Sequence, residues 1–189
     1  QLNDGRLEAA VETFSHALEL HPAHPELLIN LGVALQNLGR FDEAAAAQTR
    51  ILEQMPEDSG ALTNLASIAY EREDMAAAAD YARRATQSDP GNAAAWNNLG
   101  NALAVEERFN DAEPAFKMAL ELLPDYADAQ GNYANMLKGM GRMEEAEAHY
   151  RKALELAPGD ARHEFQLSLW LLDSGALGAG WDLYDAGFR

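Results

Sequence analysis

The sequence has no cysteine and few basic residues. It holds 14 Lys and Arg against 31 Asp and Glu among its 189 residues, which gives a formal net charge of −17. Without cysteine, disulfides, thiolate nucleophiles and cysteine-bound zinc are excluded, and the composition is compatible with a reducing compartment. The negative charge repels phosphate backbones and anionic lipid headgroups. We therefore expect neither nucleic acid nor a membrane among the partners.

Long hydrophobic runs are equally scarce. Apolar stretches such as residues 76–79 and 169–172 are far shorter than the roughly 20 residues that a membrane-spanning helix needs. No signal-peptide pattern is present either. Together with the absence of cysteine, these features favour a cytoplasmic location.

Proline recurs at a fixed interval. Successive prolines are 34 residues apart (56 − 22 = 34), at Pro22, Pro56, Pro90, Pro124 and Pro158, and such self-similarity is typical of repeat architectures. With each proline as position 32, position 20 is always alanine, at Ala10, Ala44, Ala78, Ala112 and Ala146. Each unit carries two apolar stripes at helical spacing, separated by a turn such as residues 39–42 or 141–144. This pattern predicts helix hairpins.

The same register predicts the bounds of the helices. First helices are expected near residues 25–38, 59–72, 93–106, 127–140 and 161–174, with Asp58, Asn92 and Asp160 as candidate N-caps. Second helices are expected near residues 8–21, 42–55, 76–89, 110–123, 144–157 and 178–188. The predicted domains are a lone second helix of a truncated repeat at 1–24, full repeats at 25–58, 59–92, 93–126 and 127–160, and an atypical C-terminal repeat at 161–189.

The first residue, Gln1, falls in the middle of a repeat. We therefore expect the chain to be a segment of a longer protein. The seam left by the missing first helix could pair two copies, so a homo-dimer is a further expectation.

Several residues resemble the tetratricopeptide repeat (TPR) family, most clearly residues 96–100 (Trp-Asn-Asn-Leu-Gly), Ala112, Phe116, Ala119 and Pro124. The resemblance covers nearly the whole chain. It implies an all-α fold, a right-handed TPR superhelix, or α-solenoid, of stacked antiparallel helix hairpins, because single hairpins cannot bury their own apolar faces. It also implies that positions 2, 5, 6, 9, 12 and 13 face a concave groove that holds a protein or peptide partner.

Position 6 is a row of side-chain amides. It reads Asn30, Asn64, Asn98 and Asn132, continued by Gln166, and the neighbouring groove positions hold Thr63, Ser67, Asn97, Asn101 and Asn135. An asparagine amide offers an acceptor and two donors, so it can meet both the C=O and the N–H of one residue of an extended peptide. This row predicts a peptide-binding track. Asparagine is also frequent at this position in TPR proteins generally, so common repeat ancestry is the alternative interpretation.

The end of the chain resembles the last repeat before the catalytic domain of bacterial TPR-linked protein O-glycosyltransferases. The matching residues are Leu171-Leu172, Gly175, Gly180-Trp181 and Tyr184, whereas residues 186–189 depart from the usual continuation. With the amide row, which is like that of the O-GlcNAc transferase superhelix, the resemblance implies a substrate-recruiting arm whose partner is a glycosylation substrate. Alternatively, Trp181 and Tyr184 cap an exposed end of the core, and the chain is a stand-alone scaffold for complex assembly or self-association.

Catalytic chemistry is not expected within this segment. His16, His21 and His24 lack the spacing of a zinc site, and no nucleophile motif or phosphate-binding glycine loop is present. A clamp for a terminal carboxylate would need Lys or Arg at positions 2, 5 or 6, and the four full repeats have none there. We expect no catalytic residue, metal or cofactor here, and any transferase site would lie beyond Arg189.

Overall fold

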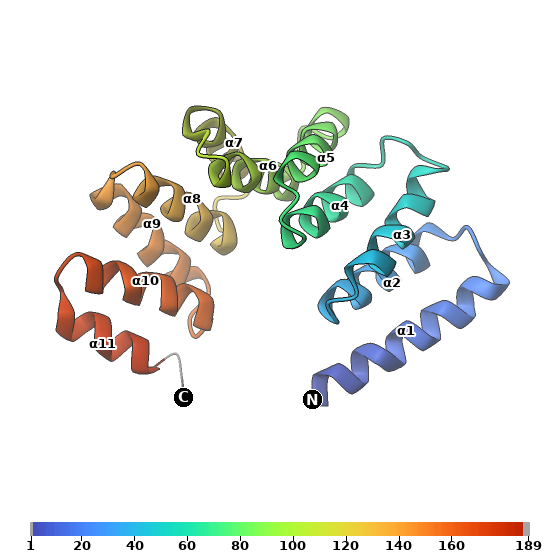
Figure 1. Cartoon of the computed structure of the whole chain (residues 1–189), viewed down its shortest axis with the longest axis horizontal. Helices are drawn as coiled ribbons and strands as arrows, with labels where there is room; N and C mark the ends of the chain where they lie inside the picture. Colours follow the sequence, from blue (N-terminus) through green and yellow to red (C-terminus); the bar gives the residue numbers. More distant parts are fainter. Residues whose placement is uncertain (1, 187–189) are drawn as a thin grey trace. The chain divides into compact units, whose positions relative to one another are not determined.

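The computed structural model describes the backbone of residues 2–186 and the side chains of residues 5–185. Between residues 2 and 186 it consists of 11 α-helices and no strand (Figure 1). The prediction of an all-α fold is therefore confirmed. The chain divides into two compact units, one up to Ala102 and one from Leu103 onward.

The first unit holds the helices up to the division, which falls inside α6. They are α1 (Leu2–Leu20), α2 (Pro25–Asn37), α3 (Phe41–Leu52), α4 (Ser59–Glu71), α5 (Met75–Ser88) and most of α6 (Ala93–Val105). The α2–α3 and α4–α5 pairs form hairpins, α1 packs on α2, and α3 packs on α4. Each hairpin of this unit therefore stacks on the next.

The second unit repeats the arrangement with α7 (Phe109–Leu122), α8 (Ala127–Gly139), α9 (Met143–Leu156), α10 (Ala161–Asp173) and α11 (Leu177–Ala186). The α8–α9 and α10–α11 pairs form hairpins, α7 packs on α8, and α9 packs on α10. No helix between residues 2 and 186 is both long and apolar enough to cross a membrane.

The predicted N-caps are confirmed. An oxygen of Asp58 accepts the N–H of Ala61 at 2.8 Å, and one of Asn92 accepts that of Ala95 at 3.1 Å. Asp160 caps α10 through the N–H of Arg162 at 2.9 Å. Each cap supplies an acceptor to an N–H group that has no partner inside its helix.

The turn inside each hairpin needs a residue in the left-handed region. Gly39 and Gly141 adopt φ of 71° and 74°, and Glu73 and Glu107 occupy the same repeat position with φ of 61° and 58°. The turn closes in the first hairpin when Arg40 N–H donates to the carbonyl of Leu35 at 2.9 Å.

The core between the helices is built on alanine. Ala44, Ala112 and Ala146 have no exposed surface, and Ala78 is 1% exposed. Because the side chain is a single methyl group, the paired helices approach closely and bury their larger neighbours, Leu28, Ile51 and Leu62 in the first unit. The repeated alanine of the sequence is therefore a packing position.

The helix α1 begins earlier than expected, at Leu2 rather than near residue 8. Gly5 and Arg6 hold the repeat positions of the turn residues Gly39 and Arg40, yet they remain helical. The turn at Gly39 is closed by a bond to the preceding helix, and the described residues contain no helix before α1 to which Gly5 could connect. Local helix formation then continues through these positions.

Candidate peptide-binding row

The five amides of the row lie on the first helix of successive hairpins. Asn30 is on α2, Asn64 on α4, Asn98 on α6, Asn132 on α8 and Gln166 on α10. The side chain of Asn30 is exposed, and the other four residues are half-buried. Residues three apart share one helix face, so Ser67, Asn101 and Asn135 lie on the same face as the amide three residues before each of them.

In the first unit, Asn98 is engaged by its neighbour helix. Its Nδ2 donates to the main-chain carbonyl of Thr63 on α4 at 3.2 Å, and its Oδ1 accepts from Nδ2 of Asn97 at 3.5 Å. Asn98 therefore connects α6 to α4 and retains one N–H for another partner. Asn97 was predicted to face the groove, but it is only 4% exposed. Its side chain is therefore buried, and from there it contacts Asn98.

The hydroxyl groups beside the row are also engaged. Thr63 Oγ1 donates to the carbonyl of Ser59 at 2.7 Å and accepts from Nδ2 of Asn92 at 3.0 Å. Ser67 Oγ accepts from Nε2 of Gln36 at 2.8 Å, which links α2 to α4. These side chains connect neighbouring helices, so they stabilise the packing of the first helices that carry the amides.

Asn30 and Asn64 differ from Asn98. Within the described part of the chain, neither side chain makes a hydrogen bond. Their donors and acceptors therefore remain available to a ligand, on two first helices of the same unit.

In the second unit, Asn135 Oδ1 accepts from the hydroxyl of Tyr150 at 2.7 Å. Gln166 Oε1 lies 3.4 Å from Nδ1 of His163 and lies over Gly131, where a Cβ atom would approach it to 2.9 Å. Gln166 therefore rests on α8. Asn132 of this unit is half-buried, as is Asn101 of the first unit.

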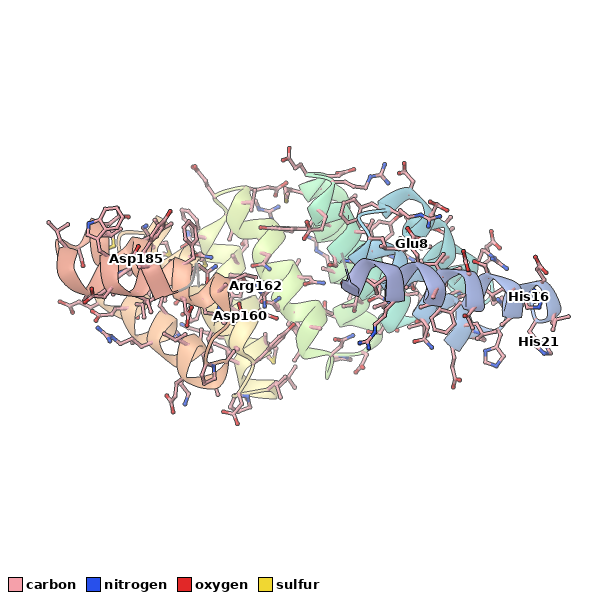
Figure 2. The ribbon with its side chains drawn as sticks, turned by 90° about the horizontal axis from the view of Figure 1, so that it is seen from below. Glu8, His16, His21, Asp160, Arg162 and Asp185 are labelled. Atoms are coloured by element: carbon pink, nitrogen blue, oxygen red, sulfur yellow. The ribbon has the colours of Figure 1, made fainter. Side chains whose placement is uncertain are left out.

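An ion-pair cluster that the sequence pattern did not predict lies at the start of α10. Arg162 Nη2 is 2.7 Å from Asp160 and 3.0 Å from Asp128 on α8, and Figure 2 shows Arg162 beside Asp160. The hydrogen bonds from Arg162 lower the pKa of the Asp160 carboxyl to about 2. Arg162 holds position 2 of the last repeat, where a carboxylate clamp would need a cation, but two carboxylates already neutralise it.

His16 and His21 lie at the C-terminal end of α1. His16 Nδ1 lies 3.2 Å from Glu19 Oε2, and Figure 2 shows His16 and His21 around the C-terminal end of this helix. Among the described residues, no group of three or more His, Asp or Glu side chains could hold a metal ion.

Solved structures share this arrangement of helices. A thermophilic TPR protein of Thermus thermophilus is 27% identical, with a TM-score of 0.76 over 89% of this chain and 92% of that one. YrrB, described as a TPR protein with an unusual peptide-binding site, is 20% identical, with a TM-score of 0.63 over 94% and 91%. The Cut9–Hcn1 hetero-tetramer of the APC/C gives a TM-score of 0.88 at 16% identity, over 97% of this chain and 36% of that one.

Family comparison agrees with the fold. No curated protein matches the sequence. Three models described as tetratricopeptide repeat match residues 1–68, 59–92 and 91–159. Together with the helix hairpins and the repeat spacing, these matches show that the chain belongs to the tetratricopeptide repeat family.

Proposed function

We propose that this TPR domain binds an extended polypeptide through the amides of the row in the first unit, Asn30, Asn64 and Asn98, and holds it by its backbone. The observation that carries the proposal is the pair Asn30 and Asn64, whose amides stand on adjacent first helices and make no hydrogen bond within the described residues. TPR proteins are protein-interaction modules, which agrees with this use of the row.

The spacing of the helices suits an extended chain. Packed helices lie roughly 8–10 Å apart, and an extended chain advances about 3.3 Å per residue. Successive amides therefore meet about every third residue of the ligand. At about 1 kcal/mol for each amide, the row alone gives millimolar binding, so side-chain contacts or a second tethered site supply the rest of the affinity.

The direct test is the double variant Asn30→Ala with Asn64→Ala. Peptides that bind the wild-type protein are first selected from a random-sequence library and then titrated against each variant by fluorescence anisotropy. Loss of two amides at about 1 kcal/mol each weakens binding about 30-fold. The matched control is Asn110→Ala, an exposed asparagine on the second helix α7, which leaves the affinity unchanged.

A change in the peptide backbone tests the mode of recognition. N-methylation of single peptide residues removes one backbone N–H at a time. If the amides of the row form hydrogen bonds with the peptide backbone, methylation lowers the affinity at about every third residue of the peptide. Unchanged affinity for the double variant, with its helical circular dichroism retained, would discard the peptide track.

We further propose that the domain recruits substrates for a protein glycosyltransferase. The pattern Gly175, Gly180-Trp181 and Tyr184 supports this proposal by its resemblance to such enzymes. Gly180 also has a packing role, because a Cβ atom there would lie 2.8 Å from the side chain of Leu172. The coding sequence after Arg189 is the test: a nucleotide-sugar-binding α/β domain supports the transferase proposal, and a stop codon removes it.

A scaffold role is the second candidate, favoured by apolar side chains on α10 and α11. Phe165, Leu177 and Trp181 are 42%, 58% and 54% exposed, and the ring of Trp181 meets that of Tyr184 edge-on at 5.6 Å. Such a face is typical of contact with another protein. Light scattering of the wild-type protein and of Trp181→Ser shows whether this face joins two copies, since only the wild type would then be dimeric.

A further inference from the structure

The two units carry carboxylates at the same positions of the helix faces that are expected to line the groove. Glu26 on α2 corresponds to Asp128 on α8, 102 residues later (128 − 26 = 102). Glu71 on α4 corresponds in the same way to Asp173 on α10 (173 − 71 = 102). The helix pair α2 and α4 is therefore equivalent to the pair α8 and α10, and the two pairs can be compared side chain by side chain.

In the second unit, both carboxylates pair with a cation on the neighbouring first helix. Asp128 on α8 lies 3.0 Å from Nη2 of Arg162 on α10. Asp173 on α10 lies 2.5 Å from Nζ of Lys138 on α8. One ion pair is near the start of these helices and the other is near their end. A carboxylate at either position is therefore within reach of a Lys or Arg side chain that comes from the adjacent helix.

In the first unit, the positions of these two cations hold uncharged residues. Gly60 on α4 stands at the position of Arg162, and Gln36 on α2 stands at that of Lys138. The amide of Gln36 is engaged elsewhere, since its Nε2 donates to Ser67 Oγ at 2.8 Å. Neither residue therefore neutralises a carboxylate on the neighbouring helix.

Glu26 and Glu71 have no cation of their own. Both residues are exposed, and within the described part of the chain neither carboxylate forms an ion pair. Arg72 follows Glu71 directly, but its Nη1 lies 3.2 Å from Asp42 on α3, with which it pairs. The groove positions between residues 25 and 102 hold no Lys or Arg. The first unit therefore presents two negative charges in its groove and no positive one.

The two carboxylates share a helix face with the amides that carry the proposed function. Glu26 lies four residues before Asn30 on α2. Glu71 lies seven residues after Asn64 on α4. Separations of four and seven bring side chains to one side of a helix, and at about 1.5 Å per residue they correspond to about 6 Å and about 10 Å along the axis. Lys and Arg have the cationic side chains that are long enough to reach a carboxylate from a backbone held by the amides.

We infer that the peptide held by the row is basic, with two Lys or Arg residues about three positions apart. One contacts Glu26 beside Asn30, and the other contacts Glu71 beyond Asn64. The spacing follows from the helices, because successive amides meet about every third residue of an extended chain. The ligand thus supplies to α2 and α4 the two cations that the second unit supplies from its own helices. This inference rests on the proposed peptide track and names the class of peptide that the track selects.

Two matched variants separate local contact from the general attraction of a basic peptide to a chain of net charge −17. Glu26→Gln with Glu71→Gln removes the two groove carboxylates. The control, Glu12→Gln with Asp80→Asn, removes two carboxylates from the second helices α1 and α5. Both variants carry the same net charge. All four positions are exposed, so the substitutions leave the fold intact.

The probe is the peptide acetyl-Gly-Lys-Ser-Ala-Lys-Gly-amide, titrated into the full chain. The NMR signals of the Asn30 and Asn64 side-chain amides report its binding to the row. The wild type is expected to bind this Lys peptide about fivefold more tightly than the same peptide with Gln at both Lys positions, because two exposed ion pairs each contribute modestly. The preference falls at high salt, since exposed charges are screened.

The variants should differ in this preference. Glu26→Gln with Glu71→Gln loses the preference for the Lys peptide, whereas Glu12→Gln with Asp80→Asn retains it. Charge reversal gives a second arm: Glu26→Lys with Glu71→Lys is expected to prefer the peptide with Glu at both positions. The spacing is tested with acetyl-Gly-Lys-Lys-Ser-Ala-Gly-amide, which keeps the charge and binds the wild type more weakly than the original peptide.

Equal affinity of the wild type for the Lys and Gln peptides would overturn the inference. A preference that survives in Glu26→Gln with Glu71→Gln would also overturn it, because the attraction would then come from the charge of the whole chain. The peptide track is judged separately by the uncharged Gln peptide. Weaker binding of that peptide to Asn30→Ala with Asn64→Ala supports the track, even where the preference for Lys is absent.

Discussion

The side-chain amide of Gln48 lies directly over Gly32, where a Cβ atom would overlap with its Nε2. Gln48 on α3 has no exposed surface, and neither its nitrogen nor its oxygen has a hydrogen-bond partner in the described part of the chain. The corresponding residues of the second unit, Phe116 and Tyr150, are aromatic and buried. Gly32 is small because it accommodates this side chain.

Replacing Gln48 by methionine is expected to stabilise the protein. The substitution keeps the length of the side chain and removes two buried polar atoms without partners, each of which costs about 1–3 kcal/mol. The free energy of unfolding in urea therefore rises by about 1–3 kcal/mol. Gln87→Met, at an exposed position of α5, serves as the control, and an equal gain there would mean that methionine stabilises by another route.

A second stabilising change is expected at Glu73, a turn residue with a left-handed backbone conformation. Glu73 adopts φ of 61° where the neighbouring hairpin has Gly39 at 71°. A non-glycine residue in this region costs about 1 kcal/mol, and the greater freedom of glycine in the unfolded chain offsets part of the gain. Glu73→Gly therefore raises the free energy of unfolding by about 0.5 kcal/mol, measured in urea. The reciprocal variant Gly39→Ala lowers it, and a loss of stability in Glu73→Gly would contradict the account.

The second unit should lose stability in acid through Glu113. Hydrogen bonds from Lys117, Arg142 and Tyr133 lower the pKa of Glu113 from 4.5 to about 2, against a partial opposing effect of burial. Because the folded-state pKa is the lower one, this contribution is fully present above about pH 4.5 and is lost as the pH falls through 2.

The variant Glu113→Gln isolates that contribution. At pH 7 it leaves Arg142 and Tyr133 without their charged acceptor, and we expect a loss of about 1–3 kcal/mol in the free energy of unfolding. The difference from the wild type shrinks toward zero at pH 2, in a series of urea titrations across this range. Glu121→Gln, at an exposed position of the same helix, is the control, and a difference that stays constant with pH would rule out the ionised carboxylate as the cause.

Single members of the amide row should affect stability unequally. Asn98→Ala removes the bond from α6 to the Thr63 carbonyl and is expected to cost about 1 kcal/mol. Asn64→Ala removes no hydrogen bond within the described residues and leaves the melting temperature almost unchanged. Thermal denaturation of the two variants distinguishes these effects. Equal destabilisation would mean that Asn64 also holds the repeats together.

The hairpins and their caps were predictable because they depend on short-range patterns. The proline spacing located α2 to α10, and Asp58, Asn92 and Asp160 were identified as N-caps from their place after each proline. The early start of α1 was not predictable, because Gly5 forms a turn only where a preceding helix supplies an acceptor carbonyl. The row of amides could be predicted from the repeat pattern. Which of these amides form hydrogen bonds within the protein could not be predicted.

The sequence by itself determined the repeat, the all-α fold and the helix face that carries the amides, since these follow from periodicity along one chain. Only the tertiary structure decided that Asn98 bonds to a neighbouring helix while Asn30 and Asn64 do not. It also decided that Gln48 is buried over Gly32 without a hydrogen-bond partner in the described part of the chain. Each of these outcomes depends on side chains from separate helices meeting in space. The spacing of residues along one helix does not show how far its side chains lie from those of another helix.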